Sequence, residues 1–152
     1  MRASEVRSII VHCAATKPSM DCGFDEINQW HLDRGWSGCG YHVIIRRNGA
    51  IEFGRDFAMD SREFSQGAHV RGHNDNSIGV CLIGGMAQDS SDPELNYTDE
   101  QWDALRDVLT RLKTTTMPGA RIHGHYEFDS HKTCPNFDAG HWYDTDEVVP
   151  TF

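Results

Sequence analysis

Residues 121–135 concentrate side chains that can bind a metal ion. The segment RIHGHYEFDSHKTCP contains three histidines, one lysine and one cysteine. Neutral imidazole and thiolate are ligands that zinc prefers. Pro135 biases the residue before it toward an extended backbone, which predicts that Cys134 lies in a defined turn. Two ligands from this segment still need a third from elsewhere, and His12 is the candidate.

The choice of ligands stays open on spacing alone. Residues 6–13 alternate as a strand, so His12 and Cys13 point to opposite faces and cannot both bind one metal. His12 could instead be a core histidine whose hydrogen bonds are satisfied inside the fold. His123 and His125 would share one face of a short strand, so either could be the second ligand.

The elements that must position these side chains follow from hydrophobic periodicity. Strands are predicted at residues 6–13, 41–46, 50–53, 77–83 and 121–124, and helices at 24–34, from the capping box at 98–101, and at 138–146. Asn48-Gly49 predicts a tight hairpin turn with two positive φ angles. Interleaved strands and helices around a hairpin predict an α/β fold, with a central mixed β-sheet flanked by helices. We expect one domain over residues 1–152.

Several single residues carry expectations of their own. Tyr41 lies at the entrance of its strand and could reach a cleft, although a packing aromatic is the alternative. We expect it to share a face with Val43 and Ile45. His31 is predicted on the surface of the first helix, with Trp30 on its apolar side. The polar loop 55–76 is long for a compact domain, which is typical of a binding feature.

Composition excludes some classes of protein. The 152 residues are 38% hydrophobic and 24% charged, with a formal net charge of −9. Such an acidic chain is repelled by phosphate backbones, so we expect no nucleic-acid partner. No apolar run is long enough for a bilayer span or a signal peptide, so we expect a cytosolic protein without membrane insertion. Five cysteines at irregular spacing predict reduced thiols.

Six blocks along nearly the whole chain carry a family resemblance. They are VHCAATKP at 11–18, GYHVIIRRNG at 40–49, GAH at 67–69, NSIGVCLIGG at 76–85, GHYE at 124–127 and KTCP at 132–135. In this order they resemble the zinc-dependent N-acetylmuramoyl-L-alanine amidases of the phage lysozyme type, which are related to the peptidoglycan recognition proteins. The fold of that family is a central mixed sheet with helices on its faces.

The resemblance implies a site, residue by residue. It implies one zinc ion per chain on His12, His125 and Cys134, with water at the fourth position, and it selects His125 over His123. It also implies that Tyr41 and Lys132 are catalytic. His69 matches a histidine that lines the substrate groove. The resemblance also implies a second role, binding and inhibition of phage RNA polymerase.

These residue types suit amide hydrolysis. Two neutral imidazoles and one thiolate leave zinc electrophilic, and the open position can lower the pKa of a water molecule to about 7. Lys132 and Tyr41 could stabilise the oxyanion. The target amide would join N-acetylmuramic acid to L-alanine in bacterial peptidoglycan. The loop residues His69, His73 and Asn74 would form a wall for this substrate, so that His69→Ala would change the kinetics with zinc retained.

A different class of function is a module that recognises peptidoglycan without cutting it. Cys134 favours the enzyme, because recognition-only relatives typically lack the thiolate ligand. The expected setting is a monomeric phage endolysin in the host cytoplasm, which reaches the cell wall with the help of a holin or of membrane disruption.

Overall fold

The computed structural model describes residues 1–152, and its centre is a five-stranded sheet. The strands are β1 (Ser8–Cys13), β2 (Val43–Ile45), β3 (Ile51–Phe53), β4 (Ser77–Leu82) and β5 (Arg121–Gly124), in the order β3-β2-β4-β1-β5. β1 pairs in parallel with β4 and β5, β2 pairs in parallel with β4, and β3 is antiparallel to β2. The sheet is therefore mixed, as predicted.

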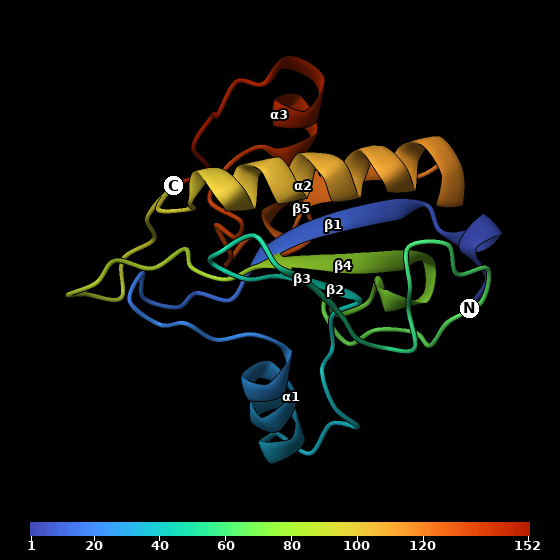
Figure 1. The fold of residues 1–152 in the computed structure, drawn as a ribbon, viewed down its shortest axis with the longest axis horizontal. Helices are drawn as coiled ribbons and strands as arrows, with labels where there is room; N and C mark the ends of the chain where they lie inside the picture. Colours follow the sequence, from blue (N-terminus) through green and yellow to red (C-terminus); the bar gives the residue numbers. More distant parts are fainter.

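Helices cover both faces of this sheet. α2 (Asp99–Arg111) and α3 (Ala139–Thr145) lie on one side, and α1 (Phe24–Asp33) lies on the other (Figure 1). A cluster of 23 buried side chains fills the α2 side, and a cluster of six fills the α1 side. The predicted single α/β domain is confirmed. None of the helices is both long and apolar enough to cross a membrane.

Short helical turns connect the main elements. Three are 3-10 turns: η1 (Ala3–Glu5), η2 (Asn74–Asn76) and η4 (His125–Glu127). The fourth, η3 (Leu112–Thr116), is a π turn that continues α2. η2 ends the polar loop 55–76 and η4 follows β5, so both lie in segments in which site residues are expected.

The two central strands are covered on both faces. All six residues of β4 are buried, and so are the last five of β1. Ile9, Val11 and Cys13 belong to the cluster on the α2 side. Alternation therefore directs His12 to the opposite face, toward the α1 side. The central position of β1 explains why a polar imidazole in it is 1% exposed.

The hairpin differs from the prediction in its turn and in the start of its strand. Only Gly49 has positive φ (85°), and its amide donates to the carbonyl of Arg46 over 2.8 Å, so the turn spans four residues. Asn48 accepts from the amide of Ala50 through its side chain instead. The ladder begins at Val43, and Tyr41 before it packs against the α1-side cluster. The expectation that Tyr41 shares a face with Val43 is wrong, because strand alternation does not extend beyond the paired residues.

Two expectations for the first helix are also wrong. α1 buries only Ile27 and His31, which are one turn apart. The His31 Nδ1 atom accepts from the Gly40 amide over 2.8 Å, and the Trp36 ring packs 4.5 Å from the His31 ring, centroid to centroid. Trp30 is 37% exposed. The helix contacts the sheet along a narrow face, so His31 replaces Trp30 as the inward residue.

Candidate functional site

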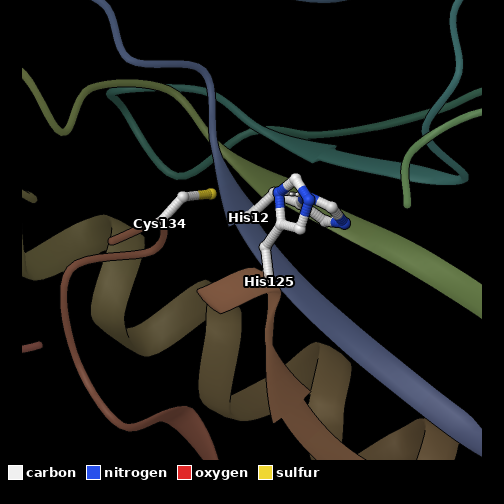
Figure 2. A group of neighbouring side chains, drawn as sticks. All are labelled: His12, His125 and Cys134. Atoms are coloured by element: carbon white, nitrogen blue, oxygen red, sulfur yellow. Dashed lines mark hydrogen bonds between the residues drawn. The ribbon is translucent and has the colours of Figure 1, made fainter. Parts of the chain in front are cut away.

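Three polar side chains from distant segments converge at one edge of the sheet. His12 comes from β1, His125 follows β5, and Cys134 lies in the next loop, with its sulfur directed toward the imidazoles (Figure 2). Their ligand atoms all lie within 4.8 Å of one another. The register of the parallel strands explains the meeting of the two histidines. Val11 pairs with Gly124, so the next residue on each strand is His12 and His125.

Backbone contacts hold Cys134 in place. Its carbonyl accepts from the Tyr126 amide over 3.0 Å, and the next carbonyl, that of Pro135, accepts from the Tyr97 hydroxyl over 2.7 Å. The Cys134 sulfur accepts from the Cys13 amide over 2.9 Å. A backbone N–H directed at sulfur favours thiolate character, as a metal ligand requires.

The geometry of these donors fits zinc. In a tetrahedral site with Zn–N distances near 2.05 Å, two nitrogen ligands are separated by about 3.3 Å. The Nδ1 atoms of His12 and His125 are 3.1 Å apart. Two imidazoles and one thiolate are also a donor set that zinc accepts in catalytic sites, where a fourth position stays open.

The protonation states agree with this role. Burial lowers the pKa of His12 well below its usual value, and burial followed by the charge of Lys132 lowers the pKa of His125. Both imidazoles are therefore neutral at pH 7. Desolvation raises the pKa of the Cys134 thiol well above its usual value, and the neighbouring Cys13 thiol adds to this. A bound cation is what would make the thiolate stable here.

A cleft of about 630 Å³ opens beside the three side chains. Tyr41 and Lys132 both line it, together with His125 and Cys134. The Tyr41 ring lies 5.1 Å from the His12 ring, centroid to centroid, and burial raises the pKa of its phenol well above the usual value. Tyr41 is thus a neutral hydrogen-bond donor. Lys132 is exposed at the rim, in a turn where its amide donates to the Asp129 carbonyl over 3.1 Å.

The three residues predicted as a substrate wall lie in different settings. His69 lines the cleft but is only 8% exposed, and its Nδ1 lies 2.8 Å from His12 Nε2. Asn74 also lines the cleft, and its side-chain oxygen accepts from the amides of His69 and Val70, each over 2.9 Å. His73 is exposed and is not among the residues that line the cleft, and its ring packs against Phe128.

His123, the alternative to His125, lies outside the group. Its Nδ1 is 3.0 Å from Glu127 Oε1, and it is not one of the three clustered ligand atoms. Spacing could not separate the two histidines, because they are two residues apart and a strand that continued to residue 125 would place both on one face. The difference is one of position: His123 pairs with Ile10, whereas η4 begins at His125, directly after the Gly124 that pairs with Val11.

Sequence reasoning missed several residues of the cleft. Arg34, Trp36 and Arg71 line it, as does His31. The guanidinium of Arg34 lies over the Trp36 ring, 5.5 Å from its centroid. These residues are on irregular segments or at a helix end, where periodicity carries no information. The signal in the sequence that could have identified the two arginines is that each precedes a glycine, in a chain whose net charge is negative.

Comparisons with known proteins identify the family and agree with the fold. The family profile described as N-acetylmuramoyl-L-alanine amidase matches residues 2–137. An endolysin of Klebsiella phage KP32 is 43% identical over 148 residues, which cover 97% of this chain and 92% of the relative. Among solved structures, the endolysin amidase LysCS from Clostridium intestinale superposes with a TM-score of 0.70 at 26% identity, covering 88% of this chain and 76% of that one. Bumblebee PGRP-SA shares the fold, with a TM-score of 0.70 at 20% identity over 93% of this chain and 81% of its own.

Proposed function

This chain belongs to the N-acetylmuramoyl-L-alanine amidase family, and from that premise we propose that it is a zinc-dependent phage endolysin. It would hydrolyse the amide bond between N-acetylmuramic acid and L-alanine in bacterial peptidoglycan. The activity is assigned to the whole of residues 1–152, with zinc on His12, His125 and Cys134. The observation that carries the proposal is the convergence of these three donors, within 4.8 Å of one another, beside an open cleft.

The roles of the side chains follow from their chemistry. When bound, zinc would supply a Lewis acid and an acidified water molecule at its open position. Tyr41, kept neutral by burial, would donate a hydrogen bond to the oxygen of the scissile carbonyl as negative charge develops there. Lys132 would add a positive charge from the rim of the same cleft.

The charges around the cleft suit a peptide with carboxylates. Arg34, Arg71 and Lys132 line it, against one carboxylate, that of Asp129. This local excess of positive charge occurs in a chain with a net charge of −9. The peptide stem of peptidoglycan would be held on this side. His69, His73 and Asn74 remain predictions as substrate contacts, and the first of them receives a different role below.

The alternative is a module that binds peptidoglycan without cutting it. Bumblebee PGRP-SA shares the fold at an identity that carries no information on activity. Cys134 favours hydrolysis, because a half-buried thiol with two imidazoles within 4.8 Å has a clear use as a metal ligand and none in simple recognition.

The setting of the enzyme is also part of the proposal. The chain would accumulate in the host cytoplasm as a monomer and reach the wall through a holin or after membrane disruption. Inhibition of phage RNA polymerase, which the family resemblance implies, is a separate prediction. Co-purification with the cognate polymerase would test it.

One experiment tests the central claim. Purified protein should contain about one zinc ion per chain and should release stem peptides that begin with L-alanine from purified peptidoglycan. A chelator should abolish release, and added zinc should restore it. Binding to peptidoglycan without release of peptides, in a sample that contains zinc, would support the recognition module instead.

A further inference from the structure

A chain of hydrogen bonds leads from His12 away from the cleft into the protein. His12 Nε2 lies 2.8 Å from His69 Nδ1. His69 Nε2 lies 3.2 Å from the Ser77 hydroxyl, which in turn lies 2.7 Å from the carbonyl oxygen of His73. Ser77 is 0% exposed and His12 and His69 are 1% and 8% exposed, so solvent has little access to these contacts.

The direction of every bond in this chain follows from its last member. A backbone carbonyl can only accept, so the Ser77 hydroxyl must donate its single proton to His73 O. Ser77 Oγ is then an acceptor, and His69 must donate to it from Nε2. A neutral imidazole carries one N–H, so His69 Nδ1 is a lone pair that accepts from His12 Nε2–H. His12 Nδ1 is consequently a lone pair, and it faces His125.

The protein holds His69 firmly in this position. A Cβ atom on Gly79 would lie 2.7 Å from the Cγ of His69, so β4 leaves room for the ring only because residue 79 is glycine. The backbone of His69 is fixed by Asn74, whose side-chain oxygen accepts from its amide. The imidazole is therefore packed against the sheet, which argues for a structural partner of His12 rather than a mobile substrate contact.

We propose that Ser77 and His69 form a positioning relay that sets His12 in the Nε2–H tautomer and presents its Nδ1 lone pair to the metal site. The part that concerns the metal rests on the proposed function, whereas the tautomer is a property of the chain alone. Partners of this kind raise the affinity of a histidine ligand by fixing its tautomer and ring orientation, and their loss typically weakens metal binding about 10- to 100-fold.

The first measurement is the tautomer of His12 in metal-free protein. Long-range ¹H–¹⁵N correlation spectra of the histidine rings should show protonated Nε2 and unprotonated Nδ1 for both His12 and His69 at pH 7.5. A His12 that is protonated at Nδ1 would overturn the relay. If the tautomers are as expected but the protein binds no zinc, the relay stands and the metal assignment of the proposed function fails.

The second measurement is the zinc dissociation constant of variants, obtained by competition with a chelating dye. His69→Leu removes the acceptor for His12, and Ser77→Ala removes the group that orients His69. Each should raise the dissociation constant about 10- to 100-fold. His69→Gln, whose side-chain oxygen can accept from His12, should recover part of the loss, whereas a merely space-filling role would be served better by leucine.

A matched control separates the relay from general damage to the core. His42 is also a buried histidine, with its ring 5.8 Å from that of His69, but it bonds to the Ser65 carbonyl and the Gly79 amide rather than to His12. His42→Leu should lower the melting temperature and leave the zinc affinity within about threefold of wild type. Full zinc affinity in folded His69→Leu, with an altered KM, would overturn the relay and support a substrate contact at His69.

Discussion

Cys134 is the proposed ligand whose chemistry would depend most on a metal. Desolvation raises the pKa of its thiol, so an uncharged thiol is the stable form without a cation. A serine in its place would bind zinc poorly, because a neutral hydroxyl is a weak ligand. We expect Cys134→Ser to lose most of its zinc and to lower peptide release more than about 100-fold, measured by elemental analysis and by chromatography of the digest.

The control for this variant is another buried cysteine. Cys22 is 4% exposed, belongs to the cluster on the α1 side and does not line the cleft. Cys22→Ala should keep its zinc and its activity. Full activity in Cys134→Ser would exclude the three-donor site.

Tyr41 is predicted to act through its hydroxyl and not through its charge. Burial raises the pKa of the phenol well above its usual value, so Tyr41 stays protonated throughout the working pH range. Tyr41→Phe should lower kcat about 10²- to 10³-fold, the effect of removing one oxyanion donor, with zinc content unchanged. Tyr143→Phe, at a half-buried tyrosine outside the cleft, is the control. An unchanged kcat in Tyr41→Phe would remove this residue from the catalytic group.

At the scale of single residues, strand alternation and the family resemblance predicted which side chains form the candidate site, but not the role of each one. The parallel register of β1 and β5 makes His12 and His125 neighbours, as the resemblance implied and the two predicted strands alone did not. The contact between His12 and His69 could not, because 57 positions separate them and the intervening loop has no periodic pattern. Arg34 and Arg71 were missed for the same reason.

At the scale of elements, one buried glutamine adds polar contacts to the apolar packing of α2 against the sheet. Gln101 is 0% exposed, and its amide nitrogen donates to the carbonyls of Ile83 and Ile45 over 2.7 and 3.3 Å. Its oxygen accepts from the Thr98 amide, which closes the predicted capping box, and from Arg47. One side chain therefore caps the helix and also donates hydrogen bonds to carbonyls at the ends of two strands.

Loss of this link should destabilise the whole fold. Gln101→Leu keeps an apolar volume but removes the short hydrogen bond to the Ile83 carbonyl, which then keeps only the Arg47 contact over 3.4 Å. The Ile45 carbonyl still accepts from the Ile83 amide. The loss of the buried Gln101 hydrogen bonds should cost about 1–3 kcal/mol in the free energy of unfolding. Urea denaturation of the variant and of Gln29→Leu, at an exposed position on α1, measures the effect. A loss below about 1 kcal/mol would contradict this role for Gln101.

Periodicity identified every strand and main helix, with bounds that differ by a few residues. The capping box at Thr98 is confirmed, because its signal is local and is written in four consecutive residues. The hairpin turn was wrong in detail for the opposite reason. Asn-Gly is compatible with more than one turn, and the choice was made by the pairing of Val43 with Phe53 and Ile45 with Ile51, which is set by the sheet.

At the scale of the whole molecule, buried neutral histidines predict sensitivity to acid. Burial lowers the pKa of His42 to about 4, whereas the unfolded chain binds this proton near pH 6.5. Between these values the unfolded state holds more protons, so stability is present above pH 6.5 and is lost as the pH falls toward 4. His31, with its pKa lowered to about 4 mainly by burial, acts in the same direction.

The comparison of wild type with His42→Gln isolates one of these protons. The wild type should lose about 2 kcal/mol more than the variant when the pH is lowered from 6.5 to 5, as measured by urea denaturation at both values. An equal loss in the two proteins would show that His42 is protonated in the folded state. The variant is the reference for the wild type, because all other titrating groups are the same in the two proteins.

The strand order has a consequence for how the enzyme is made. The first proposed ligand, His12, is in β1, and the second, His125, lies 113 positions later, directly after the edge strand β5. A ribosome delivers these segments in sequence, so a nascent chain carries the first imidazole long before it carries the second imidazole or the sulfur. Prematurely terminated translation products would therefore be unable to attack the wall of the cell that makes them, and lytic potential would appear only with completed polypeptides.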